Sequence, residues 1–185
     1  TFAKLLLKHA KERPTQRAMR EKDLGIWQTI SWAEMADEVQ SLAHGFITLG
    51  VQRGQHVAIV GENRPRLYMS MMAAQSLGAI PVPMYQDAVA QEMVYVLKDA
   101  EVSVVVVEDQ EQADKMMEVQ EQLTLLRHVI YDDPRGMRNY SEDILTAYTD
   151  FLAQGKAHRQ QHPDLFMQHV ESIRADDTAA MFYTS

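Results

Sequence analysis

The last residues of the chain, Tyr183-Thr184-Ser185, are the first candidates for chemistry, because hydroxyl groups follow an apolar run. The run from Thr178 to Ser185 is predicted as a strand. In open α/β sheets a ligand binds where a strand ends and a loop begins. Hydroxyls and backbone N–H groups at such a point bind phosphate. This run therefore ends where a phosphate-binding loop is expected to begin.

A second candidate is the loop Gly61-Glu62-Asn63-Arg64-Pro65-Arg66, which follows one predicted strand and precedes a predicted helix. A helix amino terminus at that place favours anions. The loop lacks the glycine spacing of a dinucleotide-binding motif, and a helix start capped by Asn63 is the favoured interpretation. A ligand contact is the alternative.

Metal and acid–base sites are weaker candidates. His158 and His162 have the i, i+4 spacing of zinc ligands, but Pro163 follows and no third ligand is indicated, which favours a solvated polar loop. The acid pairs are predicted as a turn (Asp132-Asp133) and a solvated strand entry (Asp176-Asp177). No catalytic residue and no metal ligand is predicted in this chain.

A group of methionines could line an apolar ligand pocket, since thioethers adapt to irregular shapes. Core packing is the favoured role. The group consists of Met69, Met71, Met72, Met84 and Met93.

Composition limits the remaining function classes. The 185 residues carry 18 Lys+Arg against 26 Asp+Glu, a net charge of −8, and no cysteine. The absence of cysteine excludes thiol nucleophiles and cysteine-bound metals and is compatible with a reducing cytoplasm. The negative net charge argues against nucleic-acid binding. Residues 67–86 carry no charge, but Gly78, Pro81 and Pro83 favour a helix followed by a buried strand over a membrane span.

The elements that would position these residues follow from periodicity. Two strands, Arg17–Met19 and Ile26–Ile30, flank a turn, and a helix opened by a Ser31/Glu34 capping box ends at Gly50. Strands then alternate with helices of 10 to 15 residues. The predicted strands are His56–Val60, Ala79–Pro83, Val102–Val107 and His128–Tyr131, and the predicted helices start after Asn63, Asp87 and Asp109.

The carboxyl-terminal third is predicted as a helix from Ser141 to about Gln154, stopped by Gly155, and then a polar, irregular surface segment, Lys156–Asp177. Strands alternating with helices predict a doubly wound α/β fold, with a mainly parallel sheet and helices on both faces.

The order of segments resembles the acyl-adenylate-forming (AMP-dependent) synthetases, and among them the bacterial long-chain fatty acid–CoA ligases. The residues that carry this resemblance are Trp27–Glu34, Leu49–Val51, Val57–Ile59, Gly61–Pro65, Ala74–Tyr85, Val107–Gln112 and Asp176–Ser185. The resemblance implies that residues 1–185 are the incomplete amino-terminal portion of the family's large domain. In the family the Tyr-Thr-Ser strand runs into a glycine-rich loop that holds the ATP phosphates, which implies nucleotide contacts for Thr184 and Ser185.

The resemblance also implies a reaction for the parent protein. A fatty acid attacks ATP to give acyl-AMP and pyrophosphate, and coenzyme A then displaces AMP, with Mg²⁺ as cofactor. The glycines of the phosphate loop, the magnesium-binding glutamate, the acyl tunnel and the catalytic lysine of the family fall after residue 185. This chain alone is therefore expected to be an inactive fragment that binds none of these cofactors tightly.

Two alternatives remain open at this point. One is another acyl-, aryl- or amino-acid-adenylating enzyme, and the other is a noncatalytic α/β module that binds a small ligand. The expected partners are small-molecule substrates and no nucleic acid. The expected location is cytoplasmic, with peripheral contact at the inner face of the membrane and homo-oligomer formation left open.

Overall fold

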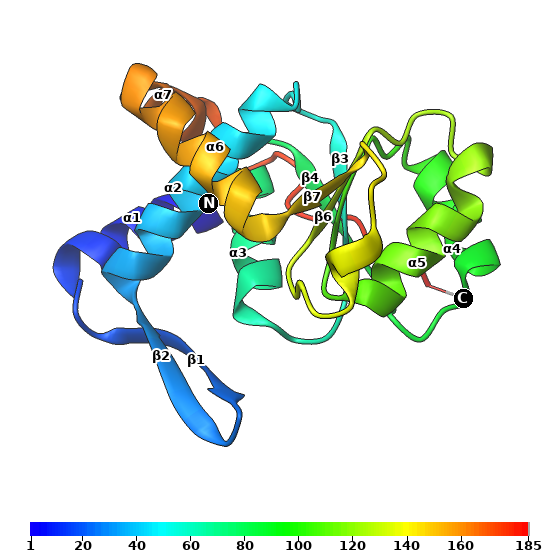
Figure 1. Cartoon of the computed structure of the whole chain (residues 1–185). Coiled ribbons are helices and arrows are strands. Elements are labelled where there is room, and N and C mark those ends of the chain that lie inside the picture. Colours follow the sequence, from blue (N-terminus) through cyan, green and yellow to red (C-terminus); the bar gives the residue numbers. More distant parts are fainter. Residues whose placement is uncertain (185) are drawn as a thin grey trace.

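The computed structural model describes residues 1–184, and these fold into a five-stranded parallel sheet between two layers of helices, with a separate hairpin (Figure 1). The helices are α1 (Phe2–Glu12), α2 (Trp32–Thr48), α3 (Pro65–Ser76), α4 (Ala90–Asp99), α5 (Gln110–Val119), α6 (Tyr148–Gln161) and α7 (Leu165–Ser172), with 3-10 turns η1 (Gln120–Gln122) and η2 (Met137–Asn139). The strands are β1 (Arg17–Asp23), β2 (Ile26–Ser31), β3 (His56–Val60), β4 (Ile80–Met84), β5 (Val104–Val107), β6 (His128–Tyr131) and β7 (Leu145–Ala147).

The central sheet has the order β4-β3-β5-β6-β7, and every neighbouring pair is parallel. Its middle strand, β5, consists of four valines that are at most 1% exposed. Branched side chains pack well on a pleated surface, and a strand covered on both faces can be apolar throughout. The prediction of a buried central strand is confirmed.

Alternate residues of β5 serve two different cores. Val104 and Val106 belong to a core with residues of α1, α2, α3, α6 and α7, whereas Val105 and Val107 belong to a core with residues of α4 and α5. Side chains of a strand point alternately to opposite faces, so the two cores lie on opposite sides of the sheet. The predicted doubly wound α/β fold with helices on both faces is confirmed.

The hairpin β1–β2 extends away from the sheet (Figure 1), and α2 follows it directly. Ser31 Oγ accepts a hydrogen bond from Glu34 N at 3.3 Å, while Glu34 Oε2 accepts one from Ser31 N at 2.8 Å. This reciprocal arrangement is the predicted capping box. The helix ends at Thr48, before Gly50, as predicted.

The predicted helix from Ser141 to Gln154 is wrong at both ends. Residues 145–147 form β7, the edge strand of the sheet, and α6 begins only at Tyr148. Gly155 does not stop this helix but lies inside it, because its role is to let α6 approach α2 closely. A glycine at a close approach and a glycine at a helix end look alike in a sequence.

The prediction that residues 156–177 are irregular surface is also wrong. This segment contains the end of α6 and the whole of α7, whose Phe166 and Val170 are each 1% exposed. Two buried apolar residues four positions apart are enough to seat a short helix on the core.

Two predicted caps and one predicted strand also differ. The residues that precede α3 and α4 are Arg64 and Val89, rather than Asn63 and Asp87. Residues 178–184 form no assigned strand, although Met181 N donates a hydrogen bond to Pro81 O at 3.0 Å. Ser185, the last residue of the predicted strand, lies outside the described residues.

The uncharged segment 67–86 divides between α3 and β4, with a turn at Gly78, as predicted. None of the helices formed by residues 1–184 has both the length and the apolar character that crossing a bilayer requires.

Candidate functional site

The carboxyl ends of four strands lie side by side at one edge of the sheet. Val60 at the end of β3 is in register with Met84 of β4 and Val107 of β5, and Val107 is in register with Tyr131 of β6. The loops that follow these strands therefore all begin at the same edge of the sheet. This edge is where doubly wound sheets bind ligands.

The chain changes direction between β3 and β5. After β3 it passes through α3 to β4 on one side, and after β5 it passes through α5 to β6 on the other. The two helices lie on opposite faces of the sheet, α3 in one core and α5 in the other. A crevice between two loops that diverge in this way is the preferred ligand position of such folds.

In this chain a side chain of the protein itself fills that crevice. Glu108, the first residue after β5, accepts hydrogen bonds from Glu62 N at 2.6 Å and from Arg64 Nε at 2.7 Å. Gly61 permits the contact, since a Cβ there would lie 2.5 Å from the Glu108 Cβ. The anion expected near this helix start is thus the Glu108 carboxylate. Among the described residues, the loop 61–66 connects the end of β3 to the end of β5 through this carboxylate.

Glu108→Gln is expected to lower the free energy of unfolding by about 2 kcal/mol, because the Glu108 side chain is only 12% exposed and Arg64 would keep only its longer pair, with the exposed Glu62 at 3.4 Å. Urea denaturation measures the change. The control is Glu111→Gln, a carboxylate that is 71% exposed and pairs with Lys115, for which no measurable change is expected. Equal effects of the two substitutions would contradict the assigned role of Glu108.

A second ion pair lies beside the first. Arg66 donates to Asp132 Oδ1 at 2.8 Å and stacks over the Tyr148 ring at 4.8 Å, and Tyr148 donates to Glu38 Oε1 at 2.7 Å. Burial raises the pKa of Asp132, and the hydrogen bond from Arg66 opposes that rise. The network joins α2, α3, β6 and α6 at the carboxyl edge.

Asp132 and Asp133 therefore have different roles. Asp133 accepts from Arg135 N at 2.9 Å, which confirms the predicted turn. The pairing of Asp132 with Arg66 was not predicted, since nothing in the sequence relates positions 66 residues apart.

A polar cleft of about 620 Å³ opens between this network and the hairpin tip, where Asp23 and Leu24 contribute to its wall. Its three arginines, Arg64, Arg66 and Arg135, are each paired with an acidic residue. Lys22 is a fourth cation in the lining, and it forms no ion pair within residues 1–184. An incoming phosphate would compete with a carboxylate at each arginine but not at Lys22.

The other part of the edge, around β4, is apolar. A hollow of about 380 Å³ beside Met84 is lined in part by Met71 and Phe182. Met69 and Met93 are buried in the core at 1% exposure, and Met72 packs against it. The core-packing interpretation holds for all five methionines, since Met71 and Met84 also pack against the cores, and three of the five in addition line hollows: Met71 and Met84 this one, and Met84 and Met93 the adjacent one.

Thr184 lies at the same end of β4. It is exposed and, together with Tyr85, lines an adjacent hollow of about 350 Å³. The preceding Tyr183 donates to Asp99 Oδ2 at 2.7 Å and meets Tyr95 edge-on, and burial together with Asp99 raises its pKa to about 12. The Thr184 hydroxyl is therefore held beside the carboxyl edge. Ser185, the second predicted contact, lies outside the described residues.

The histidines with metal-like spacing lie at the end of a helix rather than in a loop. His158 of α6 and His162, which directly follows that helix, stack at 4.5 Å between ring centroids, and His158 Nδ1 lies 2.9 Å from Nδ1 of the buried His44 on α2. His44 gave no signal in the sequence. Across residues 1–184 no three histidine or acidic side chains gather in a way that would hold a metal ion.

Comparisons with known proteins identify the family of the chain. The sequence model of a family described as "AMP-binding enzyme" matches residues 6–185. The chain is 27% identical over 183 residues to the long-chain-fatty-acid–CoA ligase FadD15 of Mycobacterium bovis, covering 99% of the chain and 29% of that protein. It is 28% identical over 169 residues to the long-chain-fatty-acid–CoA ligase ACSBG2 of Xenopus laevis, covering 91% of the chain and 22% of that protein.

Solved structures share the fold. A mutant form of coronafacic acid ligase from Pectobacterium brasiliense superimposes with a TM-score of 0.80 at 18% identity, covering 98% of this chain and 33% of that one. Acetoacetyl-CoA synthetase from Streptomyces lividans gives 0.73 at 23% identity, covering 82% and 25%. The chain thus spans less than a third of the length of the curated relatives reported above.

Proposed function

Since this chain belongs to the family of AMP-binding enzymes, we propose that residues 1–185 are the amino-terminal part of the AMP-binding domain of an ATP-dependent long-chain fatty acid–CoA ligase. The FadD15 relative, whose alignment covers 99% of the chain, supports this substrate class. Thr184 and Ser185 are the proposed nucleotide contacts. No residue among 1–184 is assigned a role at the reacting atoms.

The position of Thr184 is the observation that carries the proposal. Its exposed hydroxyl lies at the carboxyl edge of the sheet, beside Tyr85 and away from the arginine–carboxylate pairs of the polar cleft. At this edge a hydroxyl and neighbouring backbone N–H groups can donate hydrogen bonds to phosphate oxygens. The chain would thus contribute to binding and orienting ATP while a fatty acid carboxylate attacks the α-phosphate.

Magnesium is not assigned to these residues. Mg²⁺ prefers free carboxylate oxygens and water, and the two carboxylates nearest the carboxyl edge, Glu108 and Asp132, are each held by an arginine. ATP, Mg²⁺ and coenzyme A are proposed as reactants and cofactor of the complete natural protein. We propose that the isolated 185-residue chain is inactive and binds neither ATP, Mg²⁺ nor coenzyme A tightly. This inactivity is expected in the cytoplasm and in any other compartment.

Fatty-acid-dependent ATP–pyrophosphate exchange tests the proposal. The complete natural protein and the 185-residue chain are assayed side by side with palmitate, an aryl acid and an amino acid. We expect exchange with palmitate in the complete protein only, because formation of acyl-AMP is reversible and returns labelled pyrophosphate to ATP.

Each other outcome selects a different function. Exchange with the aryl or amino acid instead of palmitate would identify another adenylating enzyme of the same family. Exchange in the 185-residue chain would contradict its proposed inactivity. The absence of exchange with every acid in both proteins would favour a noncatalytic ligand-binding module.

A further inference from the structure

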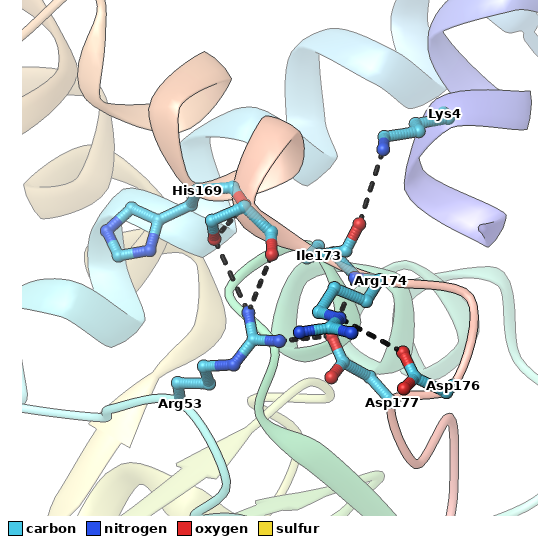
Figure 2. A network of polar contacts seen from close by, with 8 residues as sticks. Lys4, Arg53, His169, Ile173, Arg174, Asp176 and Asp177 are labelled. Atoms are coloured by element: carbon cyan, nitrogen blue, oxygen red, sulfur yellow. Dashed lines mark hydrogen bonds and ion pairs between the residues drawn. The ribbon is translucent and has the colours of Figure 1, made fainter.

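Arg53 connects the turn before the final segment to the body of the fold (Figure 2). It lies in the loop between α2 and β3, forms an ion pair with Asp177, and donates to Ser172 O at 3.2 Å. Asp177 Oδ2 also accepts from Arg174 N at 2.8 Å. One carboxylate therefore closes the turn 174–177 and fixes that turn to a residue more than a hundred positions away.

From Asp177 onward, every second residue is attached to the fold. Gln75 Nε2 donates to Ala179 O at 2.6 Å, Met181 N donates to Pro81 O at 3.0 Å, and Tyr183 donates to Asp99 Oδ2 at 2.7 Å. A period of two is that of an extended chain, in which alternate residues face the same side. Residues 178–184, called here the tail, therefore lie along β4 in one register.

The register of the tail depends on few interactions. A single backbone hydrogen bond between described residues joins the tail to β4, where a full ladder would have several. A slip by one residue in an extended segment exchanges all its inward and outward side chains. Asp177 precedes the tail directly, so its ion pair fixes where the tail begins, four residues before Met181 comes opposite Pro81.

We propose that Arg53 is a positioning residue: by holding Asp177 it sets the register of the tail on β4, and with it the place of the Thr184 hydroxyl. This inference rests on the proposed function, since it assigns Arg53 an effect on nucleotide binding without contact with the reacting atoms. The Arg53 and Asp177 side chains are 42% and 26% exposed. A pair so exposed contributes little to global stability, so the loss of Arg53 should act locally, on the tail and on the end of α7 at Ser172.

The activity test uses Arg53→Gln, Arg53→Lys, Asp177→Asn and the double variant Arg53→Gln/Asp177→Asn in the complete natural protein. Arg53→Gln is expected to raise the KM for ATP about 10-fold, with the KM for fatty acid unchanged, because a displaced contact weakens nucleotide binding. Arg53→Lys should restore most of the affinity. The double variant should cost no more than either single substitution.

The control is Arg138→Gln, an exposed arginine of η2 that makes no recorded contact with the tail among residues 1–184. Its KM for ATP should equal that of the wild type. If Arg53→Gln leaves the KM for ATP within about twofold of the wild type, or if Arg138→Gln raises it equally, the positioning role is wrong.

A second measurement does not depend on activity. Amide hydrogen exchange of Met181 in the 185-residue chain should become about 10-fold faster in Arg53→Gln, while the amides of β5 keep their rates. Unchanged exchange at Met181 overturns the inference even if the complete protein is a ligase. Conversely, absence of pyrophosphate exchange in the wild type, with faster Met181 exchange in the variant, overturns the proposed function and leaves the register effect of Arg53 established.

Discussion

Replacing Gly155 with alanine is expected to lower the free energy of unfolding by about 3 kcal/mol, as measured by urea denaturation. Gly155 lies in the middle of α6, where that helix crosses α2. A Cβ at this position would lie 1.9 Å from Ser41 O and 2.9 Å from Gly45 N. Because these are backbone atoms, the two helices would have to move apart.

The expected sign is opposite to that of helix propensity. Alanine in an ordinary helix interior is more favourable than glycine by about 1 kcal/mol, and this gain is smaller than the cost of separating α2 from α6. The neighbouring Gln154 is exposed on the same helix, so Gln154→Ala serves as control and should change stability by less than about 0.5 kcal/mol. A Gly155→Ala variant as stable as the wild type would show that the helices can accommodate the methyl group.

Acidification should destabilise the fold through His44, a buried histidine on α2 that is 0% exposed. Burial lowers the pKa of His44 to about 4, and four neighbouring groups contribute in the same direction: His158 and Arg159 of α6, His162 just after it and His169 of α7. Its Nε2 has no hydrogen-bond partner among the described residues. A proton on His44 would therefore add an uncompensated charge inside the helical layer.

The pH dependence follows from the difference between the two states. In the unfolded chain a histidine titrates near pH 6.5, so between that pH and about 4 the unfolded state binds a proton that the folded state does not. Stability should therefore be fully present above pH 6.5 and decrease as the pH falls toward 4. The total loss attributable to His44 is about 3 kcal/mol.

The measurement is urea denaturation at a series of pH values for the wild type and His44→Leu, which cannot bind the proton. The variant should lose the His44 part of the decrease in stability between pH 6.5 and 4, while burial of His128, His158 and His169, which lowers the pKa of each, leaves a smaller slope. His56→Gln, which removes a histidine of β3 outside this cluster, should keep the wild-type slope. Identical slopes for wild type and His44→Leu would mean that other groups control acid stability.

Local sequence patterns predicted most of the sheet correctly. The valines of β5, the strand at His56–Val60 and the Ser31 capping box were recognisable because each depends on residues close together in the chain. The alternation of strands and helices was sufficient to predict a doubly wound fold and to place the ligand edge at the strands' carboxyl ends.

Contacts between distant residues account for the errors. Gly155 was interpreted as a helix stop because its close approach to Ser41 involves two helices separated by a hundred positions. Helix α7 was missed because it is only eight residues long and only Phe166 and Val170 of it are buried, too few positions to establish a helical period. The tail forms no regular ladder of backbone hydrogen bonds. Strand propensity depends on residue type and does not predict whether such a ladder forms.

Some features of the candidate site could likewise be predicted from the sequence, and others could not. The sequence by itself determined the family resemblance, the strand order along the chain and the candidate hydroxyl at Thr184, since these depend on residue type and neighbouring residues. Only the tertiary structure showed that Glu108 fills the crevice between β3 and β5, and that Arg53 holds Asp177. Charged pairs such as these form wherever folding brings opposite charges together. The separation of two residues in the sequence does not predict the distance between their side chains in the folded protein.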